Sequence, residues 1–579
     1  MITHLTSLRA LGFAWLASCL SAACTSSRPP PSSPALAAAA PGFETFVGAY
    51  IERYLALHPS FAVSQGRHEF DGRLPDWSAT GLQSEVAWLE HSRVQLLGFE
   101  RTALTPEQRF RYAYILNRID TELFWRRDVR QPFTNPAFYF DSGLDPNTYV
   151  NVPYAPSEQR LRAFIQYAAA IPSALNQLRA NLELPLPKTF VDYAVAGFRG
   201  FAEFYRNDVP KAFADVHDAR LQEQLQRVLV PAAQQMSELG DWFAAQTAYS
   251  DGFVLGPQRF SAMLRQTELV TTPLAQLVVL GQADLERNLT ALAAACRAYL
   301  PNDTITACVA KQQADKPEAG VVDAARQQLA ALRRHIVERA IVTIPGTEEA
   351  RVEQAPAYRR QNFAYIEIPG PYERNLPSVY YIAPPDPAWS KAEQDAYVPG
   401  KADLLFTSVH EVWPGHFLQS LHSNRSAWLF ARLFTGYAFD EGWAHYTEEL
   451  MIEEGLAERA PELRVGQLLN ALLRNVRFVC ALGLHTQGMS VEQCEQLFED
   501  KAFQDVGNAR QQAARGTYDP AYLNYTLGKL LIRKLRADWE AENPGRPRRE
   551  FHDALLSFGG PPIPLLRTIL LKHPKAELF

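Results

Sequence analysis

The sequence has no excess of positive charge. Its 579 residues include 57 Lys and Arg against 63 Asp and Glu, a formal net charge of −6. A protein that binds nucleic acid needs a basic face to replace the counterions of phosphate, so this balance gives no support for such a partner. The chain also lacks the G-x-S-x-G elbow, the P-loop and the G-x-G-x-x-G fingerprint, which argues against serine-hydrolase and nucleotide-dependent chemistry.

A hydrophobic run long enough to span a membrane is missing from the first residues. The apolar stretch 10–16 follows Arg9 and is shorter than the roughly 20 residues of a spanning helix, so it is typical of a cleaved export signal. Cys19 closes the sequence LASC, which resembles the bacterial lipobox, and Cys24 closes SAAC, a poorer match after a longer apolar run. We predict a lipoprotein signal over residues 1–24, with Cys19 or Cys24 acylated; secretion by cleavage after an alanine is the alternative.

Residues 25–42 are rich in Pro, Ser and Ala. Such a composition cannot bury a core, and we expect a flexible tether. No later shift in composition marks a boundary, so residues 43–579 are predicted to form one large domain. A lipid-anchored protein of this kind would be exported, held at the cell envelope, and face the periplasm or the exterior.

Cysteine is scarce, with six in the whole chain. Export implies an oxidising compartment in which thiols form disulfides. The four cysteines after the tether allow three connectivities, and proximity in sequence favours Cys296 with Cys308 and Cys480 with Cys494. Buried free thiols are the alternative for the second pair. None of the four has the close spacing of a cysteine-type zinc site.

Apolar residues recur at helical spacing along most of the chain, as in Leu221, Leu225 and Leu229. Two segments differ: residues 363–368 and 378–382 are rich in β-prone side chains. They come shortly before the segment that carries the chemistry. The predicted fold class is therefore mainly α, with a small β-sheet near the active site.

That segment contains His410 and Glu411, followed by His416. Neutral imidazole is the commonest zinc ligand, and a glutamate beside such a ligand takes a proton from zinc-bound water. The histidines are six residues apart, which on an ideal helix turns their side chains about 120° from each other. We infer that the helix bulges or breaks at Pro414 and Gly415, bringing the imidazoles within the roughly 5 Å that two ligands of one zinc require.

Glu441 is the expected third ligand, because a catalytic zinc has three protein ligands and one open position. It follows His416 by 25 residues, which leaves room for a turn and a second antiparallel helix. His445 lies one helical turn further on and is expected to orient Glu441 or to contact substrate. Singly, each residue is more typical of a solvated surface; together they predict a Zn²⁺ site.

The same residues resemble the bacterial family named domain of unknown function 885. The matching pattern is His410-Glu411-x-x-Pro414-Gly415-His416-x-x-Gln419, followed by Glu441-Gly442-Trp443-Ala444-x-Tyr446-x-Glu448. Further matches, at 59–77, 473–485, 525–528 and 551–562, extend the resemblance to roughly residues 44–575. The family implies a zincin-like, mostly helical fold, a metallopeptidase or related amidohydrolase activity, and metal binding through His410, His416 and Glu441. This sequence departs from the family pattern at Phe417, at Ala481 and over residues 519–522. These departures leave the three metal positions intact.

A zinc peptidase also needs a donor for the oxyanion of the tetrahedral intermediate. Tyr525 is the first candidate and His485 the second. A core tyrosine and a buried hydrogen-bond network are the respective alternatives. Residues 378–382 are expected to form an edge strand that binds an extended substrate. Either Tyr380 or Tyr381 would face that substrate, because adjacent strand residues point to opposite faces.

Together these features predict a zinc-dependent hydrolase that cleaves amide bonds of peptides outside the cytoplasm, with Glu411 activating the water. Its expected partners are a peptide substrate and the membrane, reached through the lipid anchor, with no nucleic acid. Two alternatives stay open: a non-catalytic lipoprotein that binds peptides or envelope components, and a zinc esterase or cell-wall amidase. The sequence leaves the oligomeric state undetermined.

Overall fold

The computed structural model describes residues 42–355, 363–373, 375–385, 390–458 and 460–579. The predicted signal segment, with Cys19 and Cys24, and all of the predicted tether except its last residue lie outside the described residues. Among the described helices, none combines the length and apolarity needed to cross a membrane.

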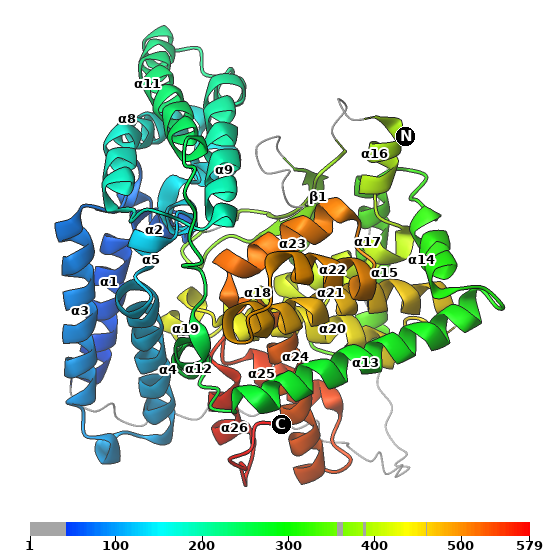
Figure 1. Cartoon of the computed structure of the whole chain (residues 1–579). Coiled ribbons are helices and arrows are strands. Elements are labelled where there is room, and N and C mark those ends of the chain that lie inside the picture. The colour runs from blue at the N-terminus through cyan, green and yellow to red at the C-terminus, as the bar shows by residue number, and fades with distance from the viewer. Residues whose placement is uncertain (1–41, 356–362, 374, 386–389, 459) are drawn as a thin grey trace, which may run out of the picture.

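The protein is mainly α-helical, as predicted, and contains one small sheet (Figure 1). The helices before the sheet are α1 (Phe43–Leu57), α2 (Pro59–Ser64), α3 (Ala79–Leu97), α4 (Pro106–Leu123), α5 (Gln131–Thr134), α6 (Ala137–Tyr139), α7 (Asn147–Asn151), α8 (Ser157–Asn181), α9 (Lys188–Asn207), α10 (Val209–Ala212), α11 (Ala219–Ala244), α12 (Gly256–Thr267), α13 (Leu274–Tyr299), α14 (Ile305–Ala314) and α15 (Val321–Arg339). The helices after it are α16 (Lys391–Tyr397), α17 (Lys401–Glu411), α18 (His416–Ser423), α19 (Leu429–Leu433), α20 (Tyr437–Glu453), α21 (Pro461–Thr486), α22 (Val491–Ala502), α23 (Val506–Tyr518), α24 (Asn524–Glu542), α25 (Arg548–Leu556) and α26 (Ile563–Leu570).

Local sequence signals set many of these helix ends. Thr105 caps α4, and Gln108 returns a side-chain bond to the Thr105 backbone, which completes a capping box. Ser490 and Gln493 form the same arrangement at the start of α22. These bonds satisfy backbone N–H groups that the first helical turn leaves without partners, so each helix begins where its capping residue stands.

The helices form two groups. Figure 1 shows α8, α9 and α11 together at one end of the molecule, above α1, α3 and α4. The second group is built around α20 and α21, where α13 packs along α21 and α24 packs along α20. One continuous cluster of buried apolar side chains runs through both groups.

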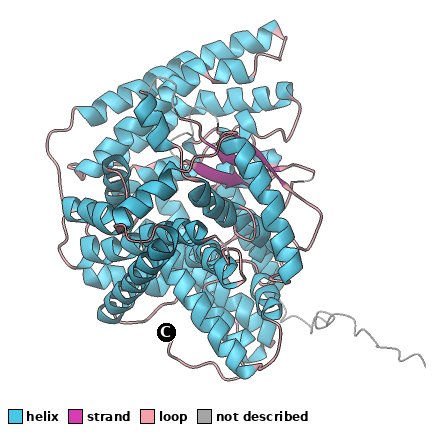
Figure 2. Cartoon of the chain, turned by 90° about the vertical axis from the view of Figure 1, so that its right-hand side faces the viewer, coloured by secondary structure: helices cyan, strands magenta, loops and turns pink. Residues whose placement is uncertain are grey.

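The sheet has three strands, in the order β1 (Ala350–Gln354), β3 (Ser378–Ile382) and β2 (Ala364–Glu367). β1 runs parallel to β3, whereas β2 is antiparallel and places Tyr365 opposite Tyr381. Figure 2 shows the strands surrounded by helices. The expectation that residues 378–382 form an edge strand is wrong, because β1 and β2 pair with both sides of β3 and all five of its residues are buried.

Two disulfides are present, and they join the neighbours in sequence. Cys296, in α13, is bonded to Cys308 in α14. Cys480, in α21, is bonded to Cys494 in α22. Each bond therefore fastens one helix to the helix that follows it in the chain.

Two glycines allow α20 and α24 to touch backbone to backbone. A Cβ atom on Gly442 would lie 2.5 Å from Cα of Gly528, and one on Gly528 would lie 1.9 Å from the carbonyl oxygen of Ala438. Both positions are too close for any side chain. The approach fixes the position of the first turns of α20.

We expect Gly442→Ala to lower the free energy of unfolding by about 1–3 kcal/mol, because the added methyl group must push the two helices apart. Urea unfolding followed by circular dichroism measures the change. Gly48→Ala, in α1, is the matched control: a Cβ there meets nothing within 4 Å, and alanine is expected to stabilise the helix by roughly 0.5–1 kcal/mol. An unchanged stability of Gly442→Ala would contradict the close contact.

Candidate metal centre

The site is built at a break between two helices. α17 ends at Glu411 and α18 begins at His416, so the predicted break at Pro414 and Gly415 is confirmed. Across it, the amide of Gly415 donates to the carbonyl of Val409 at 3.0 Å. A Cβ on Gly415 would lie 1.8 Å from the carbonyl oxygen of His410, so only glycine lets the chain fold back this closely.

The turn is held against α20 by a buried tryptophan. The indole N–H of Trp443 donates to the carbonyl of Pro414 at 2.9 Å, and Trp443 is fully buried. As a result, the ring centroids of His410 and His416 are 4.8 Å apart. This separation meets the geometric requirement set by the sequence argument.

Glu441, in the first turns of α20, faces both histidines. Its Oε2 lies 3.2 Å from Nε2 of His410 and 3.5 Å from Nε2 of His416. One ligand atom from each of the three residues lies within 4.8 Å of the others, and no other group of three His, Cys, Asp or Glu in the described part of the chain does so. Two imidazoles and one carboxylate are the protein ligand set of a catalytic zinc with an open position.

The three groups strongly perturb one another. Burial alone would raise the pKa of Glu441, but its contacts with His410 and His416 outweigh burial and hold that pKa well below the usual value. Burial alone would lower the pKa of His416, but Asp440 and Glu441 raise it well above the usual value. Without a metal ion, such a set of donors holds a proton, and a divalent cation that binds there releases this proton and takes its place. The three residues therefore fit a metal ion.

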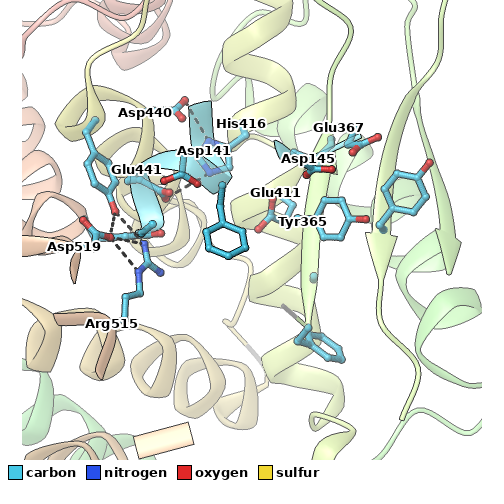
Figure 3. A pocket seen from close by; sticks show the side chains of 18 of the residues that line it. Asp141, Asp145, Tyr365, Glu367, Glu411, His416, Asp440, Glu441, Arg515 and Asp519 are labelled. Atoms are coloured by element: carbon cyan, nitrogen blue, oxygen red, sulfur yellow. Dashed lines mark hydrogen bonds and ion pairs between the residues drawn. The ribbon is translucent and has the colours of Figure 1, made fainter. Parts of the chain in front are cut away.

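Glu411 lies beside the donors without joining them. It lines the same cavity and appears with His416 and Glu441 in Figure 3. Burial raises the pKa of Glu411, and the nearby Glu441 carboxylate acts in the same direction, against the opposing effect of the two histidines. A carboxylate with a raised pKa is a better proton acceptor near neutral pH than an ordinary glutamate.

A second carboxylate orients His410. Oε1 of Glu448, which is fully buried, lies 2.8 Å from Nδ1 of His410, and the Arg474 guanidinium lies 3.1 Å from the same oxygen. This arrangement leaves Nε2 of His410, the atom that faces Glu441, as the nitrogen available to a metal ion. Sequence reasoning placed Glu448 in the motif without a role; its spacing of seven residues from Glu441, two helical turns on one face, is the signal that was available.

His445 lies next to the site but contacts a different carboxylate from the one predicted. Its Nδ1 is 3.3 Å from Oε2 of Glu448, so it supports the partner of His410 rather than Glu441. Burial lowers the pKa of His445 to about 4, and the ring is therefore neutral at neutral pH. Because it is fully buried, it has no access to a substrate.

The structure separates the two candidate oxyanion donors. Tyr525, in α24, lines the cavity, and its ring lies 6.2 Å from that of His410. The assignment of His485 is wrong: it is fully buried, does not line the cavity, and its Nε2 contacts the carbonyl of Gly516 at 2.8 Å. It lies about 12 Å further along α21 than Arg477, which does face the cavity.

The cavity has a volume of about 2980 Å³ and is lined by residues from Tyr54 to Tyr525. β2 contributes to its wall, together with Tyr381 of β3, whereas Tyr380 is buried away from it. Asp141, which no sequence motif singled out, also lines the cavity. Burial raises the pKa of Asp141 to about 7.

The chain is similar to one protein family and to two solved structures. The sequence model of the family described as bacterial protein of unknown function (DUF885) matches residues 59–570. A solved structure of a candidate lipoprotein of unknown function from Shewanella oneidensis is 23% identical, with a TM-score of 0.75, over 92% of this chain and 100% of that chain. A solved structure of a candidate lipoprotein from Colwellia psychrerythraea is 17% identical, with a TM-score of 0.74, and the match covers 91% of this chain and 98% of that chain. Both have the fold of this chain. No curated protein matches it.

We expect Gly415→Ala to separate His410 from His416 and to reduce zinc binding at least about tenfold, because the added methyl group overlaps the His410 carbonyl. Titration of zinc against a chelator measures the affinity, and circular dichroism checks that the helices remain. Gly200→Ala is the control: Gly200 lines the same cavity, and a Cβ there meets nothing within 4 Å. Wild-type affinity in Gly415→Ala would show that the fold-back does not set the donor geometry.

Proposed function

The chain belongs to the DUF885 family, and we propose that it is a zinc-dependent hydrolase that cleaves amide bonds of peptides outside the cytoplasm. The observation that carries the proposal is the convergence of the His410, His416 and Glu441 donor atoms within 4.8 Å of one another. Glu411, beside them on the same cavity wall, distinguishes a hydrolytic site from a purely structural metal site, which needs no additional carboxylate.

Each residue has a defined task in this chemistry. His410, His416 and Glu441 would hold the ion, which when bound polarises the substrate carbonyl and makes water more acidic. Glu411 accepts a proton from the water that attacks the carbonyl carbon. It then returns the proton to the amide nitrogen as the C–N bond breaks, which releases an amine and a carboxylic acid.

Tyr525 is suited to stabilise the oxyanion that forms during the attack. Burial raises the pKa of its hydroxyl, and the nearby Glu441 carboxylate adds to the effect, so the group keeps its proton and remains a hydrogen-bond donor at neutral pH. A donor that faces the reacting carbonyl lowers the barrier because the negative charge develops there.

The shape of the cavity favours short peptides. Its walls come from both groups of helices and from the sheet, so a folded protein would have to insert a segment between them. For location, we propose that residues 43–579 act as one unit carried by a lipid on Cys19 or Cys24. The lipobox-like sequences and the two candidate lipoproteins with the same fold support this placement.

We expect Glu411→Gln to lower the rate of peptide hydrolysis by about 10²–10⁴-fold while leaving zinc content unchanged, because the amide cannot accept the proton and does not belong to the donor set. Hydrolysis of a mixed library of short peptides and metal analysis of the purified protein measure the two quantities. Glu203→Gln, on the cavity wall in α9, serves as the control and should retain full activity.

The other outcomes select between the remaining functions. If the protein binds zinc but cleaves no peptide, an ester or a cell-wall amide becomes the favoured substrate. A protein that binds no zinc even after reconstitution would instead be a non-catalytic lipoprotein that binds peptides or envelope components.

We expect Glu448→Gln to weaken zinc binding about 10–100-fold, because His410 loses the carboxylate that orients its ring and raises its basicity. Competition titration with a chelator measures the change. Glu449→Gln is a matched control from the same helix: Glu449 is also buried, but it pairs with Arg287 and Arg533 instead of a histidine. Equal losses in both variants would mean that the effect is general destabilisation.

A further inference from the structure

Three arginines surround Tyr525 at the edge of the candidate metal centre. The guanidinium carbon of Arg477 lies 4.7 Å from the centroid of the Tyr525 ring, and those of Arg474 and Arg515 lie 5.8 Å from it. All three side chains line the cavity. Three positive charges are therefore gathered on the cavity wall around Tyr525, the candidate oxyanion donor.

Only two of these arginines have a carboxylate partner. Arg474 pairs with Glu448 at 3.1 Å, and Arg515 pairs with Asp519 at 3.0 Å. Arg477 makes one side-chain hydrogen bond, from Nε to the neutral amide oxygen of Gln512 at 2.8 Å. Within the described ranges, no aspartate or glutamate lies within ion-pair distance of Arg477. The cluster therefore holds one more cation than it has carboxylates to pair with.

Burial makes this surplus costly. Arg477 is 7% exposed. A buried charge without a counter-ion loses its hydration, and no ion-pair attraction compensates for that loss. Burial and the neighbouring Arg515 lower the pKa of Arg477, with Arg474 acting in the same direction. Arginine nevertheless stays charged in proteins, so the site retains a cation that a ligand anion can neutralise.

We propose that Arg477 binds the free C-terminal carboxylate of a peptide substrate, which makes the protein a carboxypeptidase-type enzyme rather than an endopeptidase. The inference rests on the proposed peptidase function and assigns its substrate class. A planar guanidinium matches a carboxylate with two parallel hydrogen bonds. In Arg477 the Nε already donates to Gln512, which leaves the two terminal nitrogens for the ligand.

The position of Arg477 limits how much of the peptide is released. Tyr525 is close to both groups: its ring is 4.7 Å from the Arg477 guanidinium and 6.2 Å from the His410 ring. The Arg477 guanidinium is therefore no further from the His410 ring than these two distances together, which corresponds to at most about three extended residues at roughly 3.3–3.6 Å each. Cleavage is therefore expected to remove one to three residues from the C-terminus.

The test compares peptides that differ only in the terminal charge. An N-acetylated five-residue library is made once with a free C-terminal carboxylate and once with a carboxamide, and kcat/KM is measured for the zinc-loaded full-length mature protein. We expect the free acids to be cleaved about ten- to hundred-fold better, the usual worth of a hydrogen bond to a charged group. A third library, amidated but with glutamate at the last position, distinguishes a terminal carboxylate from a side-chain carboxylate.

Variants assign the effect to Arg477. In Arg477→Gln the ratio of kcat/KM for the free-acid library to that for the amidated library should fall to about one, mainly through a higher KM for the free acids. Arg477→Lys should restore part of the preference. Arg464→Gln is the control on the same helix: Arg464 bonds to Gln467 but does not line the cavity, and this variant should keep the wild-type preference.

Failure of this inference can be told apart from failure of the proposed function. If wild type cleaves both libraries equally, or if products come from internal bonds, the carboxylate site is refuted while peptidase activity stands. Cleavage of neither library, together with no cleavage of the same peptides with free N-termini, argues against the peptidase itself, whereas cleavage of the free-N-terminus peptides alone refutes only the carboxylate site. Equal cleavage of the glutamate library and the free acids would reassign Arg477 to an acidic side chain and refute the terminal carboxylate. Loss of helicity or zinc in Arg477→Gln would shift the decision to Arg477→Lys.

Discussion

The contact between the Gly415 backbone and the carbonyl of His410 determines the rest of the site. It exists because Gly415 has no side chain, and it turns the chain so that two histidines six residues apart meet. Everything else is arranged around this fold-back. Trp443 bonds to the turn, and the helix that carries Trp443 also presents Glu441. A motif that is unsuitable for metal binding on a straight helix becomes suitable through a single close backbone approach.

Behind the donors lies a continuous set of buried charges. Glu448 joins His410 to Arg474, and the next layer pairs Lys529, which is fully buried, with Asp284 at 2.6 Å. Buried ion pairs give little net stability, because desolvation offsets their attraction. Their contribution here is positional: each paired charge has one arrangement that satisfies it, so the imidazole of His410 is held by groups that cannot easily rotate.

The sequence predicted what depends on short-range pattern. The mainly helical class follows from apolar spacing, and the helix break follows from Pro414 and Gly415 beside two histidines. The sequence-based predictions were wrong where contacts between distant parts of the chain determine the structure. β3 has the composition of any exposed strand, and only the pairing of β1 with it makes it central. Tyr525 and His485 were the first and second candidate donors from the sequence, and only the packed structure shows that Tyr525 faces the cavity whereas His485 is buried away from it. The lack of a carboxylate partner for Arg477 among the described residues is a property of the assembled cluster, and no local pattern reveals it.

The cavity wall also has a consequence for the timing of activity. Its residues begin with Tyr54 and end with Tyr525, so the first helices and one of the last helices enclose the same space. A chain that is still being synthesised has the candidate metal ligands before it has α24 and Tyr525. An incompletely folded molecule therefore lacks a closed substrate chamber. In the proposed hydrolase, the order of residues along the chain would make closure of the substrate chamber a late step of folding.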